Sequence, residues 1–284
     1  SASVHHFSGY YWEDPHIRGF SHLHFVGTGV ADYGNIRVTP LSDDMLDNQT
    51  PGDWYTAKGR EEAAPGYYSV RLEDVGVLAE LTADVHTGEH RYTFDGEGPH
   101  RLAFDPTSSV RDEGVQSASI EVLEDGTIRG QVTYEGSYVG RGRPFTLHFV
   151  AVPSVEPDAV STWSGETISE NSTEANGTST GAIYQWQQLS EPVELSVSLS
   201  FISNQRARDH LEDESGGTFE EERAESRAAW REVFERVRVR GGDEESRTNF
   251  FTALYNTYRM PTRFDEKGEY RGLDGEVHDV EGRY

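Results

Sequence analysis

The stretch that decides the fold runs from Ala118 to Tyr134 and reads ASIEVLEDGTIRGQVTY. Apolar and polar residues alternate on both sides of the turn residues Glu124-Asp125-Gly126. A period of two is typical of strands that bury one face, and a short Asp-Gly segment favours a tight turn. The stretch therefore predicts two antiparallel strands, Ala118–Val122 and Thr127–Tyr134.

The same strand-and-turn pattern extends from about residue 20 to residue 202, with turn signals between the runs. Many short strands at about ten-residue spacing, without helices between them, predict a mostly β fold with one large antiparallel β-sandwich. The segment Thr162–Gly181 is rich in Ser, Thr, Asn and Gly and is interpreted as an exposed hairpin loop. The further strand runs are Asn35–Thr39, Gly66–Leu72, Val77–Ala83, His90–Phe94, His100–Phe104, Phe145–Val152, Ala182–Leu189 and Val193–Ile202.

The pattern changes near residue 203. Thr218 and Glu221 have the spacing of a capping box, and apolar residues at helical spacing follow them. A second helix is expected to begin near Asp243 and to end at Pro261. We therefore divide the chain into a β-sandwich (1–202), a linker helix region (203–242) and the start of a truncated helical domain (243–284).

The formal charge of −25 excludes two classes of partner. Nucleic acids need clustered cations, and anionic membrane surfaces attract basic segments. Lys58 and Lys267 are the only lysines among 25 basic residues. An acidic, lysine-poor surface is expected in a protein adapted to high salt, and also in an ordinary acidic protein from a GC-rich genome; both explanations remain open.

Cysteine is absent, so disulfides and thiolate metal sites are excluded. No apolar run approaches the roughly 20 residues of a membrane span. The segment that begins at Ser1 lacks the features of a signal peptide, and we expect it to be a trimmed start or an internal boundary.

The segment from Arg18 to Gly34 holds the densest group of candidate functional residues. His22 and His24 would share one face of a strand, where they could ligate a transition metal or hydrogen-bond to neighbouring loops. Hydrogen bonding is favoured, because no third strong ligand follows at metal spacing. The glycines Gly27, Gly29 and Gly34 do not form a phosphate loop, since no Lys-Ser/Thr pair follows.

Three further residues have the chemistry of a sugar site. Trp54 lies beside carboxylates in a polar stretch, where an aromatic ring can stack on a sugar or fold back into the core. Arg271 and Asp274 could bind hydroxyl groups through paired hydrogen bonds, or belong to a solvated hairpin. With 50 acidic residues, no catalytic pair of carboxylates can be selected from spacing alone.

Four blocks in order resemble family 92 of the glycoside hydrolases, the calcium-dependent exo-α-mannosidases. The blocks are GFSHLH (19–24) with GTG (27–29) and DYG (32–34); EEAAPGYYSV (61–70), running on to AELTA (79–83) and GEHRYTF (88–94); FFTALYNTY (250–258); and GEYRGLD (268–274). Any one block is weak evidence, but four in order over most of the chain are rather specific.

The resemblance implies an N-terminal β-sandwich, linker helices and a helical (α/α)6 barrel, with the active site between the two domains. It also implies inverting hydrolysis of terminal α-mannosides, in which an acid and a base lie roughly 6.5–9.5 Å apart. Calcium, bound by oxygen ligands, would be the cofactor.

The resemblance assigns substrate-binding roles to Trp54, Arg271, Asp274, His22 and His24, and it implies no catalytic residue within this chain. The acid, the base and most calcium ligands are expected beyond Tyr284, in a C-terminal barrel or in a second chain that supplies it. The expected partner is a mannose-containing oligosaccharide, as in N-glycan processing, and the expected location is extracytoplasmic. We expect the 284 residues alone to be inactive on α-mannosides.

Two alternatives come from other classes of protein. The sandwich could be a stand-alone carbohydrate-binding module that uses Trp54 and Tyr55 as a platform, although such a module needs no helices at 218–260. It could also be a structural or surface protein with a salt-tolerant exterior and no sugar binding. Calcium-dependent binding of mannose would separate these alternatives from the enzyme.

Overall fold

The computed structural model describes residues 7–26, 29–259 and 263–282. Gly27 and Thr28, from the first block, and Pro261, the expected helix end, lie outside the described residues. Within the described part of the chain, no helix is long and apolar enough to cross a membrane.

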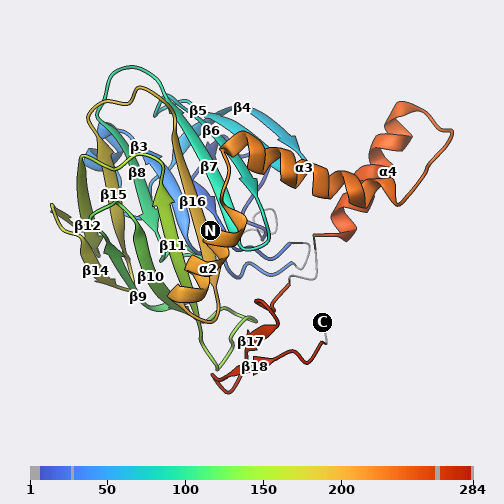
Figure 1. Cartoon of the computed structure of the whole chain (residues 1–284). Helices are drawn as coiled ribbons and strands as arrows, with labels where there is room; N and C mark the ends of the chain where they lie inside the picture. Colours follow the sequence, from blue (N-terminus) through green and yellow to red (C-terminus); the bar gives the residue numbers. More distant parts are fainter. Residues whose placement is uncertain (1–6, 27–28, 260–262, 283–284) are drawn as a thin grey trace.

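Two antiparallel sheets form the body of the molecule (Figure 1). In spatial order the 10-stranded sheet contains β1 (His16–Ile17), β4 (Thr56–Ala64), β5 (Tyr67–Leu72), β6 (Val77–Ala83), β7 (Thr87–Phe94), β16 (Val193–Ser200), β11 (Phe145–Pro153), β10 (Ile128–Tyr134), β9 (Val115–Val122) and β14 (Glu174–Gly177). The 6-stranded sheet contains β13 (Thr167–Glu170), β12 (Ala159–Ser164), β15 (Thr180–Trp186), β8 (His100–Asp105), β3 (Arg37–Leu41) and β2 (Phe20–Ser21).

The main core lies between the two sheets, where alternate residues of each strand are buried. β10 shows the alternation clearly, because Ile128, Val132 and Tyr134 are buried while Arg129 and Gln131 are exposed. Phe104 from the smaller sheet packs against Phe149 from the larger one, with ring centroids 5.3 Å apart. The mostly β fold with a large antiparallel β-sandwich is therefore confirmed.

Several elements differ from the sequence prediction. The segment Thr162–Gly181 is not a simple loop, because it contains β13 and β14, whose residues are largely exposed. A short helix, α1 (Asp43–Asn48), interrupts the strands, and the Ser42 hydroxyl caps it by accepting the Met45 N–H. The C-terminal segment forms a hairpin of β17 (Glu269–Arg271) and β18 (Val277–Asp279).

Three longer helices follow the sandwich. The polar helix α2 (Asn204–Glu214), which the sequence analysis missed, buries Ala207 and Leu211 against Val150 on the outer face of the larger sheet. Helix α3 (Phe219–Glu235) begins with the predicted capping box, in which Thr218 and Glu221 satisfy each other's backbone N–H groups. Helix α4 (Glu244–Thr257) begins after Asp243 as predicted, and it contains no buried residue.

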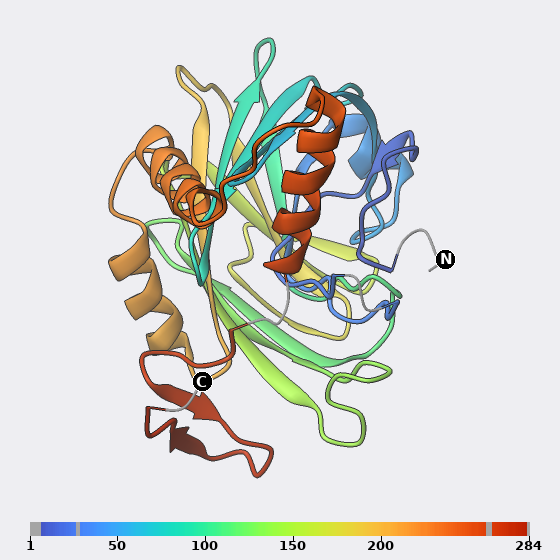
Figure 2. The same cartoon turned by 90° about the vertical axis from the view of Figure 1, so that its right-hand side faces the viewer.

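Figures 1 and 2 show α3 crossing the β5–β7 end of the larger sheet and α4 extending away from the sandwich. The rings of Trp230 and Tyr255 lie 4.6 Å apart between the two helices. Phe250 and Tyr258 on α4 keep 39% and 48% of their surface exposed. Phe250 of α4 and its C-cap residue Tyr258 thus leave aromatic surface in contact with solvent.

Candidate functional site

The predicted histidines, His22 and His24, follow β2 and do not lie together on one strand. β2 ends at Ser21, and His24 makes only an isolated bridge to Tyr33. His22 and His24 line one pocket of about 380 Å³, together with His86 and His90. The expectation that a strand holds both histidines is wrong, because the chain leaves the sheet before it reaches them.

Hydrogen bonds explain the state of His22. Its Nδ1 lies 2.6 Å from the Ile36 carbonyl, and its Nε2 lies 2.7 Å from Nε2 of His90. His90 Nδ1 in turn lies 2.8 Å from the Tyr92 hydroxyl. One chain of donors satisfies all of these groups if both rings are neutral. Burial lowers the pKa of His22 to about 4, in agreement with neutral rings. The hydrogen-bonding interpretation therefore fits His22 better than a metal ligand.

Trp54 is a core residue. It is 1% exposed and meets Trp163 edge to face, with centroids 5.1 Å apart. Both rings belong to a cluster with Leu41 and Met45, on the side of the smaller sheet that α1 covers. The interpretation of Trp54 as a sugar-stacking platform is wrong, because α1 and the strands enclose the ring. Its neighbour Tyr55 remains 48% exposed.

Arg271 and Asp274 lie in the C-terminal hairpin, but they face different partners. Arg271 donates to the carbonyl oxygens of Phe201 and Gly275, at 3.1 and 2.6 Å, and also to that of Ile202. Its guanidinium therefore fastens the hairpin to the end of β16, which differs from the expected contact with sugar hydroxyls.

Asp274 is exposed, with its carboxylate oxygens 3.0 Å from Nε2 of His278. Its neighbour His278 holds the pKa of Asp274 below its usual range, so the carboxylate is an ionised acceptor at neutral pH. Of the two predicted residues on this hairpin, Asp274 is the one whose side-chain oxygens face solvent.

Glu266 fixes the start of the C-terminal hairpin to the end of β16. This carboxylate is 1% exposed and accepts hydrogen bonds from the Ser200 hydroxyl at 2.5 Å and the Phe201 N–H at 2.7 Å. His210 Nε2 lies 3.1 Å from the same group. Burial raises the pKa of Glu266, but these hydrogen bonds outweigh it and keep the pKa below the usual range. Sequence reasoning missed this residue, since its partners are 56 and 66 positions away.

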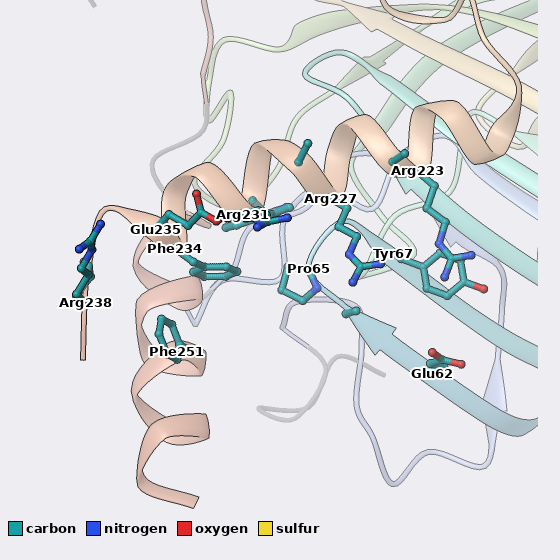
Figure 3. Close-up of a pocket in the computed structure, with 15 residues that line it drawn as sticks. Glu62, Pro65, Tyr67, Arg223, Arg227, Arg231, Phe234, Glu235, Arg238 and Phe251 are labelled. Atoms are coloured by element: carbon teal, nitrogen blue, oxygen red, sulfur yellow. Dashed lines mark hydrogen bonds and ion pairs between the residues drawn. The ribbon is translucent and has the colours of Figure 1, made fainter. Parts of the chain in front are cut away.

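A groove of about 1250 Å³ lies between α3, α4 and the β4–β5 turn (Figure 3). Arg223, Arg227 and Arg231 follow one another at helical spacing along α3. The Arg223 guanidinium lies over the Tyr67 ring, 3.6 Å from its centroid. Phe234 and Phe251 close the end of the groove between the helices. Two of these arginines pair with carboxylates of the same helix, Arg223 with Glu220 and Arg231 with Glu235, so the groove combines paired charges with aromatic rings.

One converging group of metal-ligating side chains occurs in the described part of the chain. It consists of His86, His210 and Glu214, and their ligand atoms lie within 4.8 Å of one another. Sequence reasoning missed the group. The spacing of His210 and Glu214 on one helix face was the available signal, whereas nothing local marks His86.

Comparisons with known proteins agree with this geometry. Residues 2–200 match the model of the glycosyl hydrolase family 92 N-terminal domain. Residues 206–284 match the model of the glycosyl hydrolase family 92 catalytic domain. Among curated proteins, the chain is 25% identical over 292 residues to an uncharacterized secreted glycosidase from Arthroderma benhamiae, with 90% of this chain and 36% of that protein covered.

Solved structures give the same result. A family GH92 α-mannosidase from Bacteroides thetaiotaomicron superposes with a TM-score of 0.89 at 25% identity, covering 98% of this chain and 39% of that one. Its complex with mannoimidazole gives 0.85 at 25% identity, covering 97% and 38%. An inverting family GH92 mannosidase from the same organism gives 0.84 at 23% identity, covering 96% and 37%, which supports the fold alone. The chain spans little more than a third of the length of these relatives.

Proposed function

The chain belongs to glycosyl hydrolase family 92, and from this premise we propose that it is the N-terminal portion of a calcium-dependent, inverting exo-α-mannosidase acting on terminal α-mannosides. The observation that carries the proposal is the order of the matches. The N-terminal domain and the beginning of the catalytic domain follow each other without a gap of more than a few residues. Solved relatives that align over nearly the whole chain are α-mannosidases, one of them bound to mannoimidazole.

In this proposal the chain shapes the sugar pocket and does not transfer the protons. The Asp274 carboxylate would accept hydrogen bonds from sugar hydroxyls, and Arg271 would position its hairpin through the three carbonyls that it binds. Inversion requires an acid for the leaving oxygen and a base for the attacking water, roughly 6.5–9.5 Å apart. We assign both groups to a helical domain of barrel type that follows or joins this chain.

Calcium does not fit the one metal-ligating group that the described residues offer. Calcium prefers six to eight oxygen ligands, whereas two of the three side chains here are imidazoles. We therefore propose that most of the calcium ligands lie outside the described residues.

Helix α4 is proposed to begin the helical domain, and α3 and α4 together to pack against the rest of that domain. Phe250 and Tyr258 remain exposed on α4, and a second groove of about 680 Å³ runs beside Arg247 and Tyr255. Aromatic residues and arginines are the groups enriched where protein surfaces meet. The domain division at residues 203 and 243 is part of the same proposal. The proposed location is extracytoplasmic, and N-glycans are the proposed substrates; the secreted relative supports the location.

The isolated chain is expected to show no turnover of aryl α-mannosides, and its binding of mannose or α-1,2-mannobiose is expected to be weak and calcium-dependent. Calorimetry with and without calcium tests the binding, and Asp274→Asn should reduce it, while Glu212→Gln, at an exposed position of α2, should not. Measurable turnover would contradict the assignment of the proton-transfer groups. Calcium-independent binding would favour a stand-alone carbohydrate-binding module, and no binding would count against the sugar-pocket role.

The acidic surface is proposed to be an adaptation to salt. Because 50 acidic residues oppose 25 basic ones, self-repulsion destabilises the folded chain at low ionic strength. We expect the thermal midpoint to rise steeply between 0.05 and about 1 M KCl, where the Debye length falls to roughly 3 Å. Sucrose, which stabilises by exclusion and not by screening, serves as the control. A midpoint that stays level over this KCl range would leave the ordinary acidic protein as the explanation.

A further inference from the structure

His86, His210 and Glu214 come together from two separate parts of the fold. His86 follows β6 in the turn that leads to β7, and His210 and Glu214 lie four residues apart on α2. Residues at this spacing share one helix face. The ligand atoms of the three side chains lie within 4.8 Å of one another, so a turn of one imidazole ring would bring all three to one ion.

We propose that these three side chains form a binding site for a divalent metal ion of the zinc class, which ties the sandwich to the first helix after it. Two imidazoles and one carboxylate are the ligand types that zinc accepts, with a fourth position left for water. Calcium and magnesium require oxygen ligands, so the site is distinct from the calcium of the proposed enzyme. A zinc site at this position does not depend on whether the chain is part of a mannosidase.

A second carboxylate orients the buried histidine. His210 is 2% exposed, and its Nε2 lies 3.1 Å from an oxygen of the buried Glu266. Histidine ligands in metal sites commonly donate their other ring N–H to such a carboxylate, which fixes the tautomer. The contact leaves Nδ1 of His210 for the metal.

The charge of the cluster favours a cation. Glu214 and Glu266 bring two carboxylates to the cluster. Two basic residues of the same region pair with other carboxylates, Arg206 with Glu269 and Lys267 with Asp213. A divalent ion would therefore add positive charge beside carboxylates that these two side chains do not neutralise.

The two imidazole rings define the movement that binding requires. They stack with centroids 3.8 Å apart and planes inclined by 8°. An ion lies in the plane of each ring that binds it, so two parallel rings cannot hold one ion together. His86 is the ring that would turn, because it lies outside the helix, between β6 and β7, and lines the pocket of about 380 Å³ through which an ion can enter. Loading would break the stack and the 2.6 Å contact between His86 Nδ1 and Glu214.

Zinc titration of the chelator-treated full chain tests the site. Calorimetry should show one site, and His86→Gln and Glu214→Gln should each weaken its affinity at least 10-fold. Glu266→Gln should weaken it about 10-fold or more through the orientation of His210. His16→Gln and Glu212→Gln, which change an exposed histidine outside the cluster and an exposed α2 carboxylate, are the matched controls and should bind like the unaltered chain. Circular dichroism establishes that each variant is folded.

A spectroscopic measurement distinguishes the site from general binding to an acidic surface. Cobalt(II) bound by two imidazoles and a carboxylate should give the visible absorption of a tetrahedral centre, and both ligand variants should lose it. Equal zinc affinity in the unaltered chain and in the folded His86→Gln and Glu214→Gln variants would overturn the proposal. An octahedral cobalt spectrum that the variants leave unchanged would overturn it as well.

Discussion

A Trp54→Ala chain is expected to lose about 3–5 kcal/mol of unfolding free energy. The indole is 1% exposed and packs edge to face on Trp163, in a cluster that Met45 of α1 completes. Alanine would leave a cavity that the smaller sheet and α1 cannot close. Urea unfolding followed by circular dichroism measures the loss.

Two variants sharpen this test. Tyr55→Ala, at the adjacent exposed position, should change stability by less than about 0.5 kcal/mol. Trp54→Phe should cost less than the alanine variant, because a ring remains and a buried indole N–H without a partner among the described residues is removed. If Trp54→Ala unfolded like the unaltered chain but lost sugar binding, the platform interpretation would return.

Replacing Asp32 with asparagine is expected to cost about 3–5 kcal/mol, because one buried carboxylate holds a whole turn. Its two oxygens accept the backbone N–H groups of Ser137, Tyr138 and Val139 at 2.8–2.9 Å, and the Ser137 hydroxyl at 2.9 Å. An asparagine NH₂ would face two of these donors and leave them unsatisfied. Asp44→Asn, on the exposed side of α1, is the matched control.

The difference in stability between the unaltered chain and the Asp32→Asn chain should change with pH in a defined direction. Burial raises the pKa of Asp32, but the hydrogen bonds from the turn outweigh it and hold the pKa below the usual range. A carboxylate with a lowered pKa stabilises the fold above its unfolded value, roughly 3.9, and this stabilisation is lost as the pH falls through the folded value. The difference between the two chains should therefore shrink below about pH 4. A constant difference down to pH 2 would contradict the account.

The sandwich could be predicted because its strands bury one face. Val77–Ala83 was predicted with its bounds, since a mostly apolar run lies there between Gly76 and Asp84. The capping box at Thr218 was equally local, because both of its partners lie within one helical turn. The resemblance to family 92 is confirmed by both family-model matches.

The elements that escaped prediction have no such local cause. β13 and β14 are four residues each and only partly buried on one face, and α2 is polar apart from Ala207 and Leu211, so neither pattern marks a strongly buried side. Whether Trp54 is buried or exposed depends on α1, and the ten-residue spacing of the strands does not predict this short helix. His86 and Glu214 are 128 positions apart, so only the folded chain brings them together.

The contact between His210 and Glu266 also bears on the order in which the chain folds. His210 and Glu266, 56 positions apart, close a loop at its base, and the loop contains both α3 and α4. Closing a flexible loop of this length costs about 4 kcal/mol of chain entropy beyond a constant, so the closure is expected late in folding, once the sheets exist to support it. When α4 is pulled, the contact between His210 and Glu266 is expected to resist the load, so that little of it reaches the β17–β18 hairpin.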